Sequence, residues 1–203
     1  EPAQISSRHT ANILKHIFGT LFFISESGTL DPNLADSYSV SDDGKEYTFT
    51  LRKGLTCHDG EPLTAEDVAY TFNRVVDPDL AFVGNSAGFV FPSIDFKEAR
   101  ADSELDVTIV MGAPNHIALG LISEVYVHCK DSYEKMSKEE AALNPIGSGA
   151  YEFVKWDKGS QIVLKKSPGS AVSANFENLI WRVIPEASTR TAELIAQNVD
   201  MIT

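Results

Sequence analysis

The stretch between residues 34 and 74 constrains the fold more than any other part of the sequence. Residues 47–51, Tyr-Thr-Phe-Thr-Leu, alternate apolar and polar side chains, and the tight-turn dipeptide Asp43-Gly44 lies just before them. Alternation with a period of two beside such a turn is typical of a β-hairpin. Further turn dipeptides follow at Lys53-Gly54 and Asp59-Gly60. The chain therefore changes direction every few residues here.

A helix is expected directly after these turns. Thr64 is a residue type that caps helices well, and Asp67 lies three residues later, which comes close to a capping box. Val68 and Phe72 then fall on one helical face. The pattern predicts a capped helix over residues 65–76.

This order of residues resembles the signature of the family 5 extracytoplasmic solute-binding proteins of ABC importers, which include peptide, nickel and oligosaccharide receptors. The matching blocks in this region are Leu34-Ala35-Asp36-Ser37, Asp43-Gly44-Lys45, Tyr47-Thr48-Phe49, Leu51-Arg52, His58-Asp59-Gly60-Glu61-Pro62 and Thr64-Ala65-Glu66-Asp67-Val68. Two later blocks agree as well, Asn144-Pro145-Ile146-Gly147-Ser148-Gly149-Ala150-Tyr151 and Val183-Ile184-Pro185-Glu186-Ala187-Ser188-Thr189-Arg190 with Val199-Asp200.

The resemblance implies a mixed α/β (α+β) fold: a periplasmic-binding-protein-like type II lobe with a mixed central sheet and an inserted hairpin subdomain. Residues 1–33 and 145–203 would form the main subdomain of the first lobe, incomplete here, and residues 34–144 the inserted outer subdomain. Family members are longer than this sequence, so the second lobe is expected to lie outside it.

The sequence departs from the family pattern at several places. It has Tyr38 where the family usually has Trp, Cys57 where it has Phe, and Gln197-Asn198 where it has Gly before the last block. The family's Asn-Pro-x-Tyr-Trp motif is absent from residues 167–174.

The composition excludes several classes of protein. A net charge of −12 argues against nucleic acid as a partner, because neutralising phosphates needs clustered Lys and Arg. With 43% hydrophobic residues and charges of both signs interspersed, the chain is expected to be globular. No apolar run approaches the roughly 20 residues that cross a bilayer, and the first residues lack the layout of a signal peptide. The leader is therefore expected to have been removed, or the sequence to begin after it.

Cys57 and Cys129 are the two cysteines, and they allow at most one internal disulfide. Because Cys57 replaces a family aromatic that is expected to be buried, the main interpretation is that both thiols are free and that Cys57 packs in the core as a small hydrophobe. A disulfide between them is the alternative, and metal binding by two isolated thiols a remote third.

The rest of the chain alternates helical and extended patterns. Helices are expected over residues 11–21, 114–123, 132–143 and 188–196, the last with Ser188 as its cap, and strands over residues 21–24, 105–111, 149–156, 161–165, 179–184 and 199–202. A turn is expected over residues 26–32. Residues 82–91 are rich in Gly and aromatics, and they are expected to form a loop that faces another surface or, equally, to pack under the second subdomain.

The motifs of common enzymes are absent from the sequence. Gly147-Ser148-Gly149 has the wrong spacing for a nucleophile elbow and lacks the third glycine of a dinucleotide fingerprint. No pair among the five histidines has metal-ligand spacing on a helix. His58-Asp59 could suggest an acid–base pair, but neighbouring side chains on a strand point to opposite faces, so a structural hydrogen-bonding role is expected. We expect no enzyme activity, no cofactor and no metal.

By resemblance, the function is that of an extracytoplasmic receptor that captures a peptide or another small solute and delivers it to an ABC permease in the membrane. A non-transport sensor or interaction module on the same fold, or a hydrolase that has reused the lobe, are the alternatives. The location is expected to be the periplasm, or the outer face of a Gram-positive membrane through a lipid anchor. The family's ligand contacts map onto Ser7, Arg8, His9, Phe82, Asn85, Glu124 and Tyr126.

The same resemblance implies that strands of the complete protein flank the sheet of this chain. A sheet without them has an open edge, and open edges pair with other chains. Apolar surface that the second lobe covers in the family would also be exposed. The isolated chain is therefore expected to fold but to self-associate.

Overall fold

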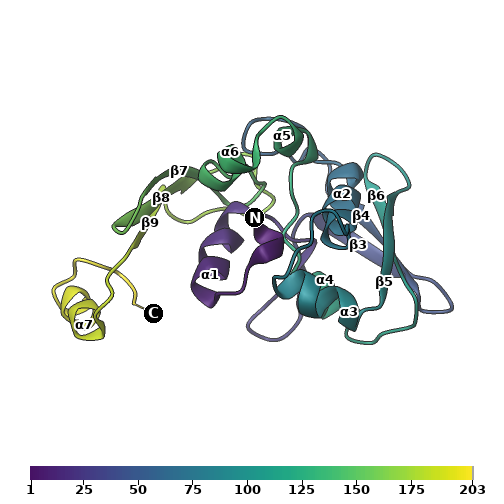
Figure 1. The fold of residues 1–203 in the computed structure, drawn as a ribbon, viewed down its shortest axis with the longest axis horizontal. Helices are drawn as coiled ribbons and strands as arrows, with labels where there is room; N and C mark the ends of the chain where they lie inside the picture. The colour runs from purple at the N-terminus through teal and green to yellow at the C-terminus, as the bar shows by residue number, and fades with distance from the viewer. Residues whose placement is uncertain (203) are drawn as a thin grey trace.

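A computed structural model describes residues 1–202 (Figure 1). The helices are η1 (Pro2–Gln4), α1 (Arg8–Ile17), α2 (Ala65–Val75), the π-helix η2 (Ser86–Val90), α3 (Phe91–Ser93), α4 (Ala118–Ile122), α5 (Lys130–Glu134), α6 (Lys138–Leu143) and α7 (Ala187–Ile195). The strands are β1 (Phe22–Ile24), β2 (Leu30–Pro32), β3 (Ala35–Val40), β4 (Glu46–Leu51), β5 (Phe96–Ala101), β6 (Asp106–Met111), β7 (Tyr151–Asp157), β8 (Gln161–Lys166) and β9 (Asn178–Arg182). The mixed α/β class is as expected from the sequence.

The largest sheet is antiparallel with strand order β3-β4-β6-β5, and the predicted hairpin is its β3-β4 pair. On β4, Tyr47, Phe49 and Leu51 are buried, while Thr48 on the opposite face hydrogen-bonds Thr108 of β6 at 2.8 Å. The alternation seen in the sequence therefore separates a core face from a polar face.

Helix α2 packs against β5 and β6 and closes the core of this sheet. Its capping box is present: the Asp67 carboxylate accepts the backbone N–H of Thr64 at 2.7 Å. Val68 and Phe72 are fully buried, and the Phe72 ring contacts Phe91 at a centroid distance of 5.5 Å. The helix predicted from capping and periodicity is confirmed.

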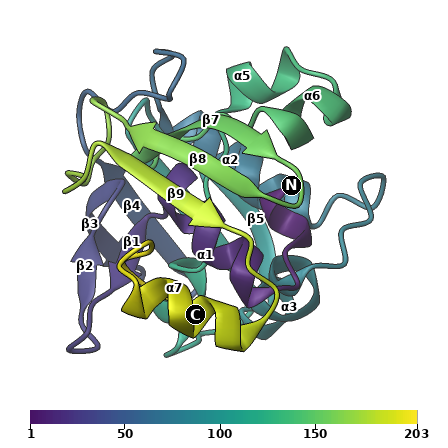
Figure 2. The same ribbon diagram turned by 90° about the vertical axis from the view of Figure 1, so that its left-hand side faces the viewer.

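A smaller antiparallel sheet, β7-β8-β9, lies against α1 (Figure 2). Ile17 and Phe18 at the end of α1 share a buried cluster with Tyr151 of β7 and Leu164 of β8. The larger cluster draws its buried residues from positions 3 to 129 and includes none from α1, which packs with the smaller cluster. The division into subdomains 1–33 with 145–203 and 34–144 stays a prediction.

Helix α7 and the end of the chain project away from the rest of the molecule (Figure 1). None of the described α7 side chains is buried, and Ile195 is 78% exposed. An ion pair of 2.9 Å between Arg182 of β9 and Glu193 of α7 joins the helix to the sheet. The capping residue is Glu186 and not Ser188, so the helix begins one residue earlier than expected.

Several segments differ from the expectations. The helix expected over residues 11–21 spans residues 8–17, and the loop expected over residues 82–91 contains the π-helix η2. The turn expected over residues 26–32 contains β2, which pairs with β1. The polar helix expected over residues 132–143 is two short helices, because Ser137 interrupts it and caps α6 through a capping box with Glu140. The last strand, expected over residues 199–202, is irregular through residue 202, the last one described.

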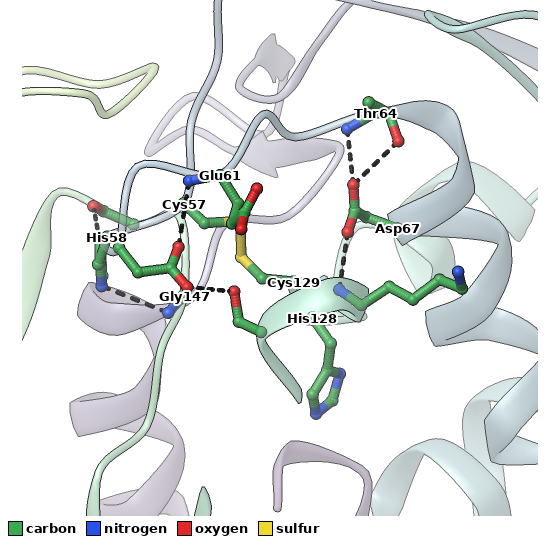
Figure 3. Close-up of a disulfide and its surroundings, with 12 residues drawn as sticks. Cys57, His58, Glu61, Thr64, Asp67, His128, Cys129 and Gly147 are labelled. Atoms are coloured by element: carbon green, nitrogen blue, oxygen red, sulfur yellow. Dashed lines mark hydrogen bonds between the residues drawn. A yellow bond between two sulfur atoms is a disulfide. The ribbon is translucent and has the colours of Figure 1, made fainter. Parts of the chain in front are cut away.

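The expectation of two free thiols is wrong, because Cys57 and Cys129 form a disulfide with a Cα–Cα distance of 6.2 Å (Figure 3). Both residues are buried, at 3% and 1% exposure. They are 72 residues apart, and tertiary packing brings the turn after Leu55 against the segment that leads into α5. No local pattern in the sequence predicts that these two cysteines lie close together.

Across residues 1–202, every helix is too short or too polar to traverse a lipid bilayer.

Removal of the disulfide is predicted to destabilise the chain considerably. In the chain-entropy model, a cross-link that closes a loop of this length lowers the free energy of the folded relative to the unfolded state by about 4 kcal/mol. The Cys57→Ala, Cys129→Ala double variant should therefore unfold at a clearly lower urea concentration. Equal midpoints for the variant and the unreduced parent would contradict this, as would a thiol titration that finds two free thiols in the parent.

Candidate ligand-binding site

A cavity of about 580 Å³ opens where η1, α1, β1 and η2 meet the segments 123–126, 149–150 and 170–172. It is larger than the hollow of about 370 Å³ beside α2 and α3, and segments far apart in the sequence supply its walls. Its volume is in the usual range for small-molecule sites.

Asn85, Glu124 and Tyr126, which the sequence singles out, all line this cavity. The backbone N–H of Asn85 donates to the Ile5 carbonyl at 2.9 Å, and its side-chain amide reaches the Glu124 carboxylate at 3.5 Å. The Tyr126 hydroxyl donates to the Ala11 carbonyl of α1 at 3.2 Å. The fold therefore brings together three side chains that are up to 41 residues apart in the sequence.

The other four predicted residues lie elsewhere on the described surface. Ser7, Arg8 and His9 are exposed where α1 begins. The Phe82 ring lies 5.2 Å from the Arg74 guanidinium and faces the shallower hollow of about 370 Å³. Their part in ligand binding stays a prediction.

The sequence reasoning missed the apolar wall of the cavity. Phe23 and Ile24 on β1 are 40% and 54% exposed and line it, and so does Val172 from the loop after β8. Strand alternation could have predicted the position of Phe23, because a strand that buries Phe22 must turn Phe23 to the other face.

Lys15 and His16 of α1 supply the basic groups on the cavity wall. Burial against Tyr151 and Trp181 lowers the pKa of His16 to about 4, and the neighbouring Lys15 charge adds to this. His16 is therefore neutral near pH 7, and Lys15 carries the positive charge. Burial also raises the pKa of Tyr126, so its hydroxyl stays protonated.

Residues 147–149, here called the floor, pack against the end of α1, and Gly149 among them lines the cavity. A Cβ atom on Gly147 would lie 2.1 Å from the Ile17 carbonyl oxygen, and one on Gly149 would lie 2.5 Å from that of His16. Only glycine permits this approach of the two backbones. The Gly149 N–H then donates to the Ile17 carbonyl at 2.8 Å.

His58 also makes hydrogen bonds to Gly147 and Gly149. Its backbone N–H donates to the Gly147 carbonyl at 2.8 Å, and its Nδ1 accepts the Gly147 N–H at 3.3 Å (Figure 3). Since Nδ1 accepts, Nε2 carries the proton and donates to the Gly149 carbonyl at 3.0 Å. Burial lowers the pKa of His58, which keeps the ring neutral in this role. The structural role expected for His58 is confirmed.

The described side chains include no cluster of three or more His, Cys, Asp or Glu residues that could hold a metal ion. What the cavity offers is an apolar wall, a carboxylate, an ammonium group, an amide and backbone carbonyls. Such a wall is suited to binding.

A comparison with family models matches residues 29–203 to the bacterial extracellular solute-binding proteins, family 5. The chain belongs to this family. The match covers both the hairpin region and the sheet beside α1, and it includes half of the residues that line the cavity.

Among curated proteins, this family 5 chain is similar to heme-binding protein A of Haemophilus influenzae, with 31% identity over 200 residues, which cover 89% of this chain and 36% of the relative. It is 30% identical over 183 residues to the dipeptide-binding protein of Escherichia coli, covering 80% of this chain and 34% of that protein. The chain therefore spans little more than a third of the length of these relatives.

Solved structures of family 5 proteins show the same fold. The periplasmic binding protein DppA from Helicobacter pylori, in complex with the peptide STSA, superposes with a TM-score of 0.89 at 25% identity and covers 98% of this chain and 43% of its own. NikZ from Campylobacter jejuni, in complex with Ni(L-His), gives a TM-score of 0.85 at 28% identity over 98% of this chain and 39% of its own. A periplasmic-binding-protein-like architecture is thereby confirmed.

The stability of the chain is predicted to fall on mild acidification. A histidine whose folded pKa is lowered binds protons more readily when unfolded, so its contribution is complete above pH 6.5 and is lost as the pH falls toward the folded pKa. For His16 the window lies between about pH 6.5 and pH 4. Urea denaturation at intervals across this window should show a falling free energy of unfolding.

The variant His16→Phe should flatten that dependence, while His9→Phe, at an exposed position of the same helix, should leave it unchanged. A wild-type slope in the His16→Phe variant would contradict the assignment.

Proposed function

We propose that this chain is the ligand-capturing part of an extracytoplasmic solute-binding receptor, which takes up a peptide or another small solute and delivers it to the permease of an ABC transporter. The observation that carries the proposal is the cavity whose lining unites Asn85, Glu124 and Tyr126 within the part of the chain that matches family 5. In this proposal the chain is a binding protein and catalyses no reaction.

The chemistry of the cavity supports a solute with both apolar and charged groups. Phe23, Ile24 and Val172 offer apolar surface, Glu124 a carboxylate and Lys15 an ammonium group. A peptide has a matching amine, carboxylate and side chains. The relatives bear the names of receptors for heme, glutathione, dipeptides and deoxycholate, so the fold accepts solutes of several shapes.

The disulfide supports a location outside the cytoplasm. Structural disulfides persist in oxidising compartments and are rare in the cytosol. We place the receptor in the periplasm, or on a lipid anchor outside a Gram-positive membrane, where it would meet the permease.

We also propose that Ser7, Arg8, His9 and Phe82 approach the solute in the complete receptor, where a second lobe would close over the cavity. Hinge closure of this kind buries a ligand between two lobes. In the chain as described these four side chains lie outside the cavity lining, and closure would be needed to bring a ligand to them.

Loss of the aromatic wall is predicted to weaken solute binding. Native mass spectrometry of the full-length receptor should first identify the solute that copurifies with it. Phe23→Ala should then weaken the binding of that solute by about tenfold in calorimetry, since burying an aromatic ring against a ligand contributes on the order of 1–2 kcal/mol.

The matched control is Tyr38→Ala, which removes an aromatic ring of similar exposure from β3 outside the cavity lining. Its affinity should equal that of the parent. Equal losses in both variants, or none in either, would remove this cavity from the binding site.

The isolated chain is predicted to self-associate. The apolar side chains of Ile180, Ile195 and Met201 are 54%, 78% and 78% exposed, all near its C-terminal end. Multi-angle light scattering over a concentration series should show dimers or larger species. The triple variant with Ser at these positions should shift toward monomer, and a parent that stays monomeric at all concentrations would refute the proposal.

A further inference from the structure

We infer that the Cys57–Cys129 disulfide positions the cavity, by joining two of its walls that are remote from each other in the sequence. The inference rests on the proposed ligand-binding role of the cavity. One wall is the segment Glu124–Lys130, here called the wall segment, and the other is the floor formed by residues 147–149.

From Glu124 to Val127 the wall segment alternates between cavity and core, and it stays buried at His128 and Cys129. Glu124 and Tyr126 line the cavity, whereas Val125, Val127 and Cys129 are at most 2% exposed. The orientation of the two cavity residues therefore depends on how firmly the alternate side chains are held beneath them.

Within the described chain the wall segment does not pair with a β-strand. Its backbone N–H groups donate instead to single acceptors on separate elements. The Val127 N–H donates to the Gly19 carbonyl at 2.9 Å, the His128 N–H to Thr71 Oγ1 at 2.8 Å, and the Lys130 N–H to Asp67 Oδ1 at 2.7 Å. Two of these acceptors are side chains, which can rotate away. The covalent bond at Cys129 is the one link in the segment that cannot open by rotation.

The other end of the disulfide leads to the floor. Cys57 begins a turn in which its own N–H donates to the Glu61 carbonyl at 2.8 Å. His58 follows directly and makes the hydrogen bonds to Gly147 and Gly149 already described. Figure 3 shows these parts side by side, with the floor contacts on one side of the two sulfurs and the Asp67 contacts on the other.

The path from one wall to the other is therefore short. It runs from Tyr126 along two residues to Cys129, across the sulfurs to Cys57, and through His58 to Gly149. A site whose walls are fixed before the ligand arrives loses less conformational entropy on binding. Loss of the disulfide should loosen both walls while the sheets stay intact.

The test is hydrogen exchange on the Cys57→Val, Cys129→Ala double variant, which keeps both positions apolar. At a temperature where the far-ultraviolet circular dichroism matches that of the parent, the amides of Val127 and His128 and those of Gly147 and Gly149 should exchange at least tenfold faster. The amides of the β4-β6 and β7-β8 pairs should accelerate only by the factor that the measured loss in the free energy of unfolding accounts for, and the wall amides should accelerate at least tenfold more than that. Unchanged wall amides, or the same acceleration at every site, would overturn the inference.

Two further variants separate positioning from general destabilisation. Ile109→Ala removes a fully buried side chain on β6 and should lower the melting temperature without selective exchange at the walls. His58→Gln keeps the disulfide and should accelerate Gly147 and Gly149 while Val127 and His128 keep their parental rates. Selective wall exchange in Ile109→Ala, or no change at the floor in His58→Gln, would count against the inference. The hydrogen-exchange experiment uses no solute. A negative result there would therefore leave the receptor proposal standing, and a failure to bind solute would leave the exchange result unaffected.

Discussion

The buried carboxylate of Asp67 holds together parts of the molecule that would otherwise be independent. One of its oxygens accepts both the backbone N–H and the hydroxyl of Thr64, and the other accepts the N–H of Lys130. Burial raises the pKa of Asp67, and the hydrogen bonds from Thr64 and Lys130 offset part of that rise. A carboxylate that receives several N–H and O–H donors is costly to replace, because each donor would remain buried without a partner. The start of α2 and the start of α5 are thus fixed to each other by one side chain.

The close contact between α1 and the residues before β7 is the second constraint. The two glycines there let one backbone approach the carbonyl groups that end α1, and these carbonyls need partners. His58 then supplies a second set of contacts from the outer part of the chain. The cavity lies where these contacts converge, so its shape depends on backbone packing as much as on the side chains that line it.

Elements with strong local signals could be predicted from the sequence, and elements defined by distant contacts could not. The capping box and the apolar spacing of α2, and the alternation on β4, lie within a few residues of the element that they specify. Strand β2, in contrast, is a three-residue segment that exists because β1 pairs with it. The disulfide depends on packing across 72 residues, and the replacement of a family aromatic pointed to the opposite conclusion. For the cavity, resemblance identified Asn85, Glu124 and Tyr126, while Phe23 could have been found from strand alternation but was overlooked.

The exposure of α7 has a consequence for how the chain unfolds. Since the described side chains of this helix contribute nothing to either buried cluster, its helical hydrogen bonds gain little from tertiary packing. A helix of nine residues is marginal on its own in water. The segment after β9 therefore forms a separate cooperative unit of low local stability, which opens and closes many times for each global unfolding event. A protease added to the native chain would cut there first and leave the cavity, the disulfide and both main sheets in place.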